Sequence, residues 1–173
     1  LFIATWDVGN QIYGNLVLPS PLETFQTLFL MLQDELVIQE IKTTLYRAAV
    51  GFGSSLLFGS ILGLLAGFFA TASMMSRPIV TILMGMPPIA WIVLAMIWFG
   101  MGDETVIFTV IIASFPIIFV GALQGTRTLE GDLQKMAKSF NLPWHMKFID
   151  IYFPHIFSYI FPAWVSALGM AWK

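Results

Sequence analysis

Long apolar stretches separated by short polar segments make up most of this chain. Four of them reach the roughly 20 residues that a helix needs to cross the hydrocarbon of a bilayer, and they occupy residues 41–71, 78–100, 105–126 and 152–172. No charged side chain occurs from 48 to 76 or from 105 to 126. The pattern predicts an all-α, polytopic membrane protein with four full spans.

The beginning of the chain is more polar. The apolar run 1–6 is too short to span, and we interpret it as the end of a first membrane segment whose beginning is missing. Glycine, asparagine and proline residues make 7–20 a predicted loop outside the membrane. We therefore divide the chain into 1–40, which holds this segment, the loop and one amphipathic helix, and 41–173, a transmembrane core with a cytoplasmic loop at about 125–150.

The amphipathic helix is predicted from its start signals and its periodicity. Ser20 is a good N-cap, Pro21 fits the first helical position, and Glu23 fits the first turn. Apolar residues then recur every three or four positions from 22 to 32. This spacing indicates a helix that lies on the membrane surface.

Small residues recur at every fourth position of the first predicted span, so they share one face of a helix. Apolar burial does not drive helix association in lipid, where close packing takes its place. A stripe of small residues lets a second helix approach. We predict a helix-packing face made of Gly51, Ser55, Gly59, Gly63 and Gly67.

A polar segment interrupts the apolar pattern at residues 129–154, LEGDLQKMAKSFNLPWHMKFIDIYFP. We predict a short helix at 132–140, a break at 141–143 and a second helix that enters the last span. Asn141 tolerates a left-handed backbone, and Pro143 cannot continue the first helix. This helix–turn–helix at the membrane surface is suited to binding a partner in solution.

Composition supports a membrane protein and excludes several other classes. Of the 173 residues, 58% are hydrophobic and 10% are charged, whereas soluble domains are about a quarter charged. The absence of cysteine excludes disulfides and thiolate metal sites, and a net charge of −2 gives no indication of nucleic-acid binding.

No catalytic or cofactor motif is evident in the sequence. His145 and His155 are too far apart for a helical metal site, and no phosphate-binding loop occurs. We expect no enzyme activity, metal or cofactor in this chain, so that any ATP would be used by a partner.

The basic residues predict the orientation in the membrane. Loops on one side carry a series of arginines and lysines, whereas the loop at 100–104 and residues 7–40 carry none. Cytoplasmic loops are rich in Lys and Arg. We therefore expect the cytoplasmic side to hold Arg77, Arg127, Lys135, Lys138 and Lys147.

The polar segment resembles the cytoplasmic loop of bacterial ABC importer permeases. That loop has the pattern E-A-A, three residues, G, nine residues, I-x-L-P. Setting residues 151–154 on I-x-L-P puts Asn141 on the glycine and residues 135–137 on E-A-A. The spacing is kept, Lys135 replaces the acid, and the matching letters are Ala137, Ile151 and Pro154.

A second motif limits the resemblance to one class of ABC importer permeases. Residues 87–100, PPIAWIVLAMIWFG, are similar to the P-P-x-A-x-x-P-L-x-x-x-W-F-G run of permeases in the taurine, alkanesulfonate and nitrate importer class. Val93 replaces the third proline. The resemblance begins at residues 18–23, LPSPLE, and covers nearly the whole chain.

The resemblance implies a helical bundle of the type I ABC importer permease kind, in the bacterial inner (cytoplasmic) membrane, of which this chain would be a fragment. It implies a small, anionic cargo such as a sulfonate, taurine or nitrate. The partners would be a dimer of ABC ATPase subunits that binds ATP and Mg²⁺, a second permease copy forming a homodimer, a periplasmic or lipid-anchored substrate-binding protein, and the bilayer.

Two sets of site residues follow from the resemblance. The adjacent prolines remove two backbone donors and kink their span. Two interpretations explain them equally well: a structural kink alone, or a translocation pathway that includes Pro87, Pro88 and Trp98. The residues expected to couple to the ATPase are Lys135, Met136, Ala137, Ser139, Phe140, Asn141, Leu142 and Pro154.

Three alternatives stay open. The cargo could be a vitamin precursor or another small solute. A secondary transporter would carry ionisable residues in the middle of the membrane, which the four predicted spans lack. A membrane assembly subunit would explain the small-residue stripe but not the polar helix–turn–helix.

Overall fold

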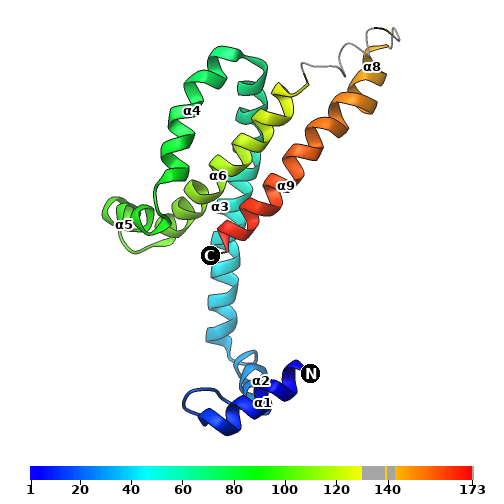
Figure 1. Cartoon of the computed structure of the whole chain (residues 1–173). Helices are drawn as coiled ribbons and strands as arrows, with labels where there is room; N and C mark the ends of the chain where they lie inside the picture. The colour runs from blue at the N-terminus through cyan, green and yellow to red at the C-terminus, as the bar shows by residue number, and fades with distance from the viewer. Residues whose placement is uncertain (130–138, 140–142, 173) are drawn as a thin grey trace. The chain divides into compact units, whose positions relative to one another are not determined.

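The computed structural model describes residues 1–129, 139 and 143–172, which contain helices and no strand. This confirms the predicted all-α fold. Two compact units divide the chain, residues 1–45 and 46–173. The elements follow one another as in Figure 1: α1 (Phe2–Tyr13), α2 (Pro21–Met31), α3 (Glu35–Phe68), α4 (Ala70–Gly85), α5 (Pro88–Phe99), α6 (Asp103–Arg127), α8 (Trp144–Met146), the π-helix η1 (Lys147–Tyr152) and α9 (Phe153–Ala171).

Helix α2, in the first unit, starts where the sequence predicts. The Ser20 hydroxyl accepts a hydrogen bond from the backbone N–H of Glu23 at 3.2 Å, and Pro21 is the first helical residue. The cap satisfies a donor that has no partner inside the helix. The predicted N-terminus of the amphipathic helix is therefore confirmed.

The prediction of a loop at 7–20 is wrong in its first half, because α1 continues to Tyr13. Gly14, with φ 76°, is the residue that ends the helix. Tertiary contacts outweigh the weak helix propensity of this stretch. Trp6 Nε1 donates to the Pro19 carbonyl at 2.9 Å, and Asn10 Nδ2 donates to the Leu18 carbonyl at 2.6 Å. These bonds hold the turn after α1 against the helix.

The first predicted span corresponds to α3, with different ends. The helix begins at Glu35, earlier than the predicted 41, and the Asp34 carboxylate accepts a hydrogen bond from the Leu36 N–H at 2.9 Å near its start. It stops at Phe68 because Phe69 is extended, with φ −115° and ψ 114°. The predicted continuation to 71 is therefore wrong, and α4 begins at Ala70.

The second predicted span, 78–100, consists of two helices. Helices α4 and α5 meet at an angle of 95°. Neither Pro87 nor Pro88 has a backbone N–H, so the helical hydrogen bonds cannot continue through this point. The sequence predicted the kink here but placed the helix start at Pro78, which instead lies within α4.

The last two spans agree closely with the sequence-based bounds. Helix α6 includes Pro116, and α9 follows η1 without a break. The π-helix ends at Tyr152, two residues before Pro154, whose ring would clash with the carbonyl four residues earlier in a regular α-helix. The wider π turn relieves this clash, so the chain enters α9 as a continuous helix.

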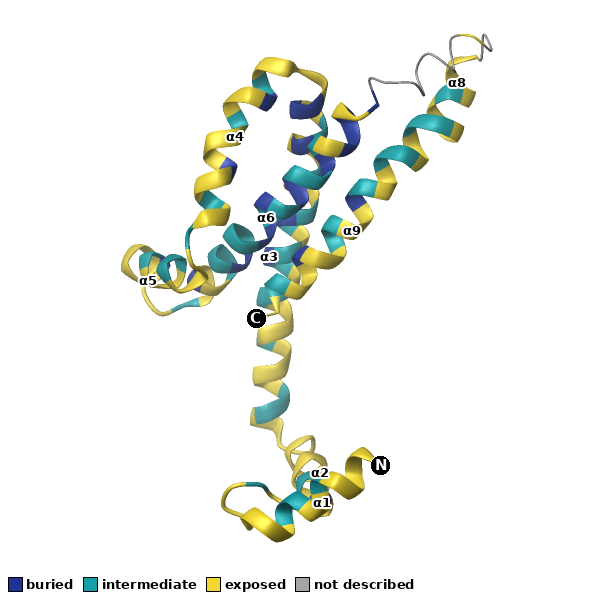
Figure 2. Ribbon diagram, viewed as in Figure 1, coloured by how far each residue is buried: buried dark blue, intermediate teal, exposed yellow. Residues whose placement is uncertain are grey.

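Buried residues of the second unit are concentrated along α6, and the outer faces of the helices are exposed and apolar (Figure 2). Ile118 is 0% exposed, whereas Phe58 on α3 is 56% exposed and Phe161 on α9 is 51% exposed. Exposed apolar surface of this extent requires lipid around it.

Within the described residues, three helical segments are long and apolar enough to cross a membrane: Glu35–Phe68, Asp103–Arg127 and Trp144–Ala171. The α4–α5 pair is a fourth if it counts as one broken span. The chain is a multi-pass membrane protein, as the hydropathy pattern predicts.

Candidate functional site

The small-residue stripe of α3 lies against α6. All five residues of the stripe are buried. A Cβ atom added to Gly59 would lie 3.1 Å from Cβ of Ile118, and one added to Gly63 would overlap the carbonyl oxygen of Phe119. At these positions α3 and α6 approach too closely for a side chain, which is the geometry that small-residue stripes permit in lipid.

Polar side chains add to the contacts of α3. The buried Ser55 hydroxyl lies 2.9 Å from the Gly51 carbonyl oxygen and 3.4 Å from that of Ile111 on α6. Trp164 on α9 donates its indole N–H to the Ser60 hydroxyl at 3.1 Å. The hydroxyls of Ser55 and Ser60 thus have hydrogen-bond partners within the bundle.

A second close contact, which the sequence analysis missed, joins α6 to α9. A Cβ on Gly121 would overlap Cβ of Ala163, and one on Gly125 would lie 3.1 Å from the backbone of α9. Ser114 donates to the Ala167 carbonyl at 3.4 Å. The sequence does carry the signal, because Gly121 and Gly125 form a G-x-x-x-G motif.

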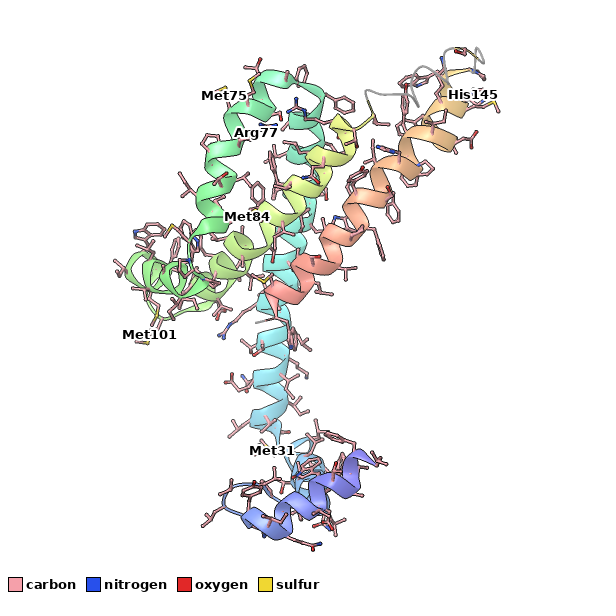
Figure 3. The ribbon with its side chains drawn as sticks, viewed as in Figure 1. Met31, Met75, Arg77, Met84, Met101 and His145 are labelled. Carbon is pink, nitrogen blue, oxygen red and sulfur yellow. The ribbon has the colours of Figure 1, made fainter. Side chains whose placement is uncertain are left out.

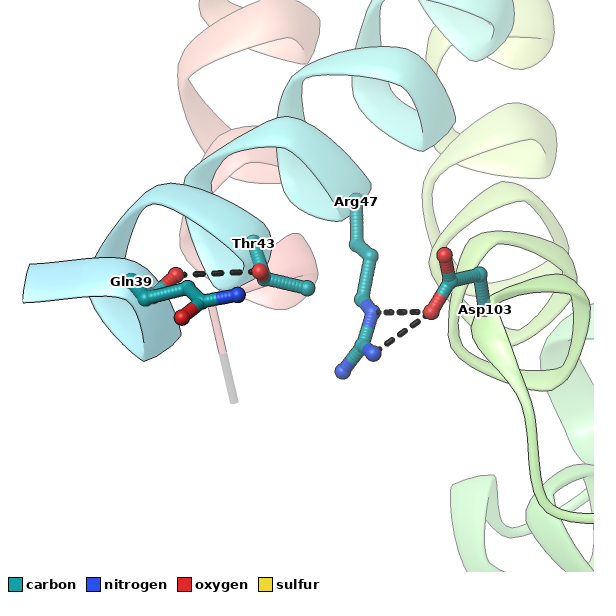
Figure 4. Close-up of polar contacts among 4 residues, drawn as sticks. All are labelled: Gln39, Thr43, Arg47 and Asp103. Carbon is teal, nitrogen blue, oxygen red and sulfur yellow. Dashed lines mark hydrogen bonds and ion pairs between the residues drawn. The ribbon is translucent and has the colours of Figure 1, made fainter. Parts of the chain in front are cut away.

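An ion pair connects α3 to the start of α6 (Figure 4). Arg47 donates to one carboxylate oxygen of Asp103, from Nε at 2.8 Å and from Nη2 at 2.5 Å. The two side chains are 28% and 54% exposed, so the pair contributes at most about 1 kcal/mol to stability. The pair lies next to the short loop after α5, where the two charges neutralise each other.

A pocket of about 110 Å³, here called the inner pocket, lies beside the break between α4 and α5. Pro88 lines it, and Pro87 is the N-cap residue of α5. The third predicted pathway residue lies elsewhere: Trp98 is 57% exposed and packs edge-on against Phe99 and Phe108. The structure thus places the two prolines, but not Trp98, next to this pocket.

Trp91 is a residue of the inner pocket that the sequence analysis did not single out, as is Thr109. Trp91 lines the pocket, and its Nε1 is buried without a hydrogen-bond partner in the described structure. An unsatisfied buried donor costs about 1–3 kcal/mol. On the facing helix, Pro116 cannot donate to the carbonyl of Ile112, which lines the same pocket.

A larger hollow of about 430 Å³, here called the basic groove, lies between α4 and α6. Arg77 on α4 and Arg127 on the last turn of α6 both line it, as does Met84; Figure 3 labels Arg77 and Met84. Arg127 Nη1 donates to the hydroxyl of Ser73, which is 0% exposed, at 2.7 Å. Neither arginine forms an ion pair with an acid among the described residues.

The predicted coupling residues lie mostly outside the described residues. These are Lys135, Met136, Ala137, Phe140, Asn141 and Leu142. The helix predicted at 132–140 also lies outside the described residues, apart from position 139. Ser139 is helical and exposed, and Pro154 is exposed in the first turn of α9.

A hydrogen bond joins the two residues that flank the predicted coupling segment, 129–154. His155 Nε2 lies 2.9 Å from the Thr128 hydroxyl, which joins the start of α9 to the end of α6. His145 is exposed on α8. No group of His, Cys, Asp or Glu that could hold a metal occurs where the structure describes the chain.

Residues 55–173 match the family model of the binding-protein-dependent transport system inner membrane component. The chain is also similar to three permeases. It is 25% identical to the aliphatic sulfonates transport permease protein SsuC of Bacillus subtilis, over 99% of this chain and 63% of that protein. It is 24% identical to the taurine transport system permease protein TauC of Escherichia coli, over 100% of this chain and 65% of that protein.

The third permease is the nitrate import permease protein NrtB of Synechocystis, with 27% identity over 77% of this chain and 48% of that protein. The chain thus spans less than two thirds of the length of these relatives. The family match includes the α4–α5 break, both pockets, α6 and α9.

Proposed function

Because this chain belongs to the family of binding-protein-dependent transport system inner membrane components, we propose that it is the permease subunit of an ATP-driven ABC importer for a small anion. The family match over residues 55–173 carries the proposal. The chain would act in transport and not as an enzyme, since the three similar proteins are transport permeases.

The chemistry of the cargo is proposed from the relatives and from the pockets together. Aliphatic sulfonates, taurine and nitrate, which the relatives' names specify, all carry a negatively charged group of oxygens. The basic groove offers two guanidinium groups, and among the described residues no acidic side chain lines it or the inner pocket. These donors favour an oxyanion, whereas a cation would find no carboxylate there.

Coupling to the ATPase is proposed to run through residues 129–154. Met136 and Phe140 are four residues apart, so on a helix they would share one face and fill an apolar groove on the ATPase. A dimer of ATPase subunits would bind ATP and Mg²⁺. A second permease copy and a periplasmic or lipid-anchored binding protein would complete the assembly.

The packing of the helices supports a mechanism of alternating access. Helix α9 continues directly from the coupling segment through η1 and packs closely on α6, which packs closely on α3. A displacement of the segment would therefore move these three helices together. The break at Pro87–Pro88, where helical hydrogen bonds are missing, is the point at which the chain can bend.

Co-purification tests the proposal. We expect the permease to copurify in detergent with a separate ATPase. Replacing Met136 and Phe140 by Asp should abolish this binding, because burying an unpaired charge costs several kcal/mol and each 1.4 kcal/mol is a factor of ten in affinity. The melting temperature of the permease should not change.

Two results would contradict the docking role: a double variant that keeps its ATPase, or one that loses both the ATPase and the fold. A permease that purifies without any ATPase and takes up solute along an ion gradient would instead be a secondary transporter.

A further inference from the structure

The hydrogen bond between Thr128 and His155, at the base of the coupling segment, has a defined direction. The Thr128 hydroxyl has one proton, which it donates to the Gln124 carbonyl at 2.8 Å. Thr128 Oγ1 therefore accepts from His155 Nε2 at 2.9 Å, and the imidazole carries a proton on Nε2. Thr128 thus bonds both to its own helix and to α9.

Tyr159 holds the His155 ring in place. The two rings lie one turn apart on α9, with their centroids 5.3 Å apart. Tyr159 also belongs to the close contact between α6 and α9, where a Cβ on Gly125 would lie 3.2 Å from Cβ of Tyr159. Because this packing already orders the imidazole, its hydrogen bond to Thr128 costs little further side-chain entropy.

The residue before Thr128 ties the same end of α6 to a third helix. Arg127 Nη1 donates at 2.7 Å to the hydroxyl of Ser73 on α4, which is 0% exposed. Hydrogen bonds from a charged donor are stronger than those between neutral groups. The basic groove separates α4 from α6 at this end, so the Arg127–Ser73 bond connects two helices that are not closely packed here.

A purely local role in ending α6 gives a poorer account of these contacts. In the described structure, Thr43 and Thr81 bond only to the carbonyl four residues earlier. Thr128 makes that bond as well, and this bond alone satisfies its hydroxyl proton. The bonds from His155 and to Ser73 instead join different helices, directly beside the segment predicted to contact the ATPase.

We propose, on the basis of the function proposed above, that Arg127, Thr128 and His155 are positioning residues for coupling. They fasten the last turn of α6 to α4 and α9, so that α4 moves together with α3, α6 and α9 when the ATPase displaces the segment. These contacts stay closed during transport. The movement is then taken up at the break before α5, where helical hydrogen bonds are missing.

The bond can be detected without transport. The chain has two histidines, so His145→Gln leaves the imidazole of His155 alone. At about pH 8, above the ordinary His pKa of about 6.5, nitrogen-15 NMR of the permease in detergent should show the Nε2–H tautomer. Adding Thr128→Val should shift the Nε2 resonance. A main tautomer with the proton on Nδ1, or a spectrum that Thr128→Val leaves unchanged, would overturn the proposal.

The number of solute molecules imported per ATP hydrolysed measures the role in coupling. In proteoliposomes with the ATPase and binding protein, Thr128→Val and Ser73→Ala should each lower this number about two- to tenfold, as expected for losing one hydrogen bond. The ATPase should stay bound. Thr128→Ser keeps the hydroxyl and should restore the parent's value.

Thr43→Val is the matched control, because it removes the same bond to the carbonyl four residues earlier, at 2.9 Å from Gln39 (Figure 4). It should leave the import per ATP unchanged. A merely structural role of Thr128 would lower the melting temperature and both rates, with the import per ATP kept, and this result would overturn the proposal. A parent complex without ATP-dependent uptake of taurine, methanesulfonate or nitrate contradicts the proposed function instead.

A metal bridge tests whether the contact stays closed during transport. Thr128→Cys, combined with His145→Gln, places the one thiol of the chain next to His155, and a thiolate and an imidazole can bind Zn²⁺ together. Import per ATP should be low without Zn²⁺ and rise toward the parent's value with it. Thr43→Cys in the same background should not respond. If Zn²⁺ stops uptake by the Thr128→Cys variant or leaves its import per ATP low, the proposal is wrong.

Discussion

Replacing Gly63 by alanine adds one methyl group at the tightest point between α3 and α6. The added Cβ would overlap the carbonyl oxygen of Phe119 and lie 2.8 Å from Cβ of Ala122. Backbone atoms cannot rotate away from this contact as a flexible side chain can. We therefore expect the two helices to shift apart and the permease to lose stability.

Gly53 on the same helix allows the size of this effect to be isolated. A Cβ added there meets no atom within 4 Å. Both alanine variants gain about 1 kcal/mol in helix propensity over glycine, so the difference between them reports only the steric cost. Overpacking costs about 1–3 kcal/mol, and 1 kcal/mol shifts the Tm by about 2–4 °C for a domain of this size. Gly63→Ala should thus melt about 2–12 °C below Gly53→Ala.

The assay is thermal unfolding of the purified permease in detergent, with monodispersity as a second measure. Gly59→Ala should fall between the other two variants, because its Cβ would lie 3.1 Å from the side chain of Ile118, which can adjust. Leucine at position 59 or 63 should prevent assembly. If Gly63→Ala and Gly53→Ala have the same Tm, the added methyl group meets no steric obstacle, and the close approach of α3 to α6 is refuted.

Two further predictions concern topology and the loop after α5. Cysteine at Ser139 should be labelled only from the cytoplasm and cysteine at Asp103 only from outside; the reverse pattern would refute the orientation and with it the docking role. Thr105→Val should destabilise the permease by about 1–3 kcal/mol, because the buried Thr105 hydroxyl lies 2.5 Å from the Gly100 carbonyl oxygen. Thr109→Val, whose hydroxyl bonds within its own helix, should cost less in the same melting experiment, and equal losses would contradict this role of Thr105.

The membrane helices could be predicted from the sequence because hydropathy reports directly on the solvent around a helix. Their ends were harder to place. Helix α4 starts at Ala70 because the chain turns at the extended Phe69, and the nearby Gly67 belongs to the repeating small-residue stripe and so does not mark the turn. Prolines predicted the site of the break after α4, but its angle of 95° depends on how α5 packs against its neighbours, which a local pattern does not contain.

The candidate site was predicted less completely. Pro88 was identified from its motif, whereas Trp91 and the groove between Arg77 and Arg127 depend on contacts between helices that are far apart in the sequence. In the sequence, each arginine by itself predicts only the cytoplasmic end of a helix. Their convergence on one groove becomes visible only once α4 and α6 are placed side by side.

ATP-driven uptake by the reconstituted complex would decide whether this chain is the permease subunit of an ABC importer. Proteoliposomes would contain the permease and its ATPase, with the binding protein and radiolabelled taurine, methanesulfonate or nitrate on the side opposite the ATPase. We expect uptake of at least one of these anions that requires ATP hydrolysis and is lost when Met136 and Phe140 are both changed to Asp. Uptake that continues without ATP, or that persists in the double variant, would contradict this expectation.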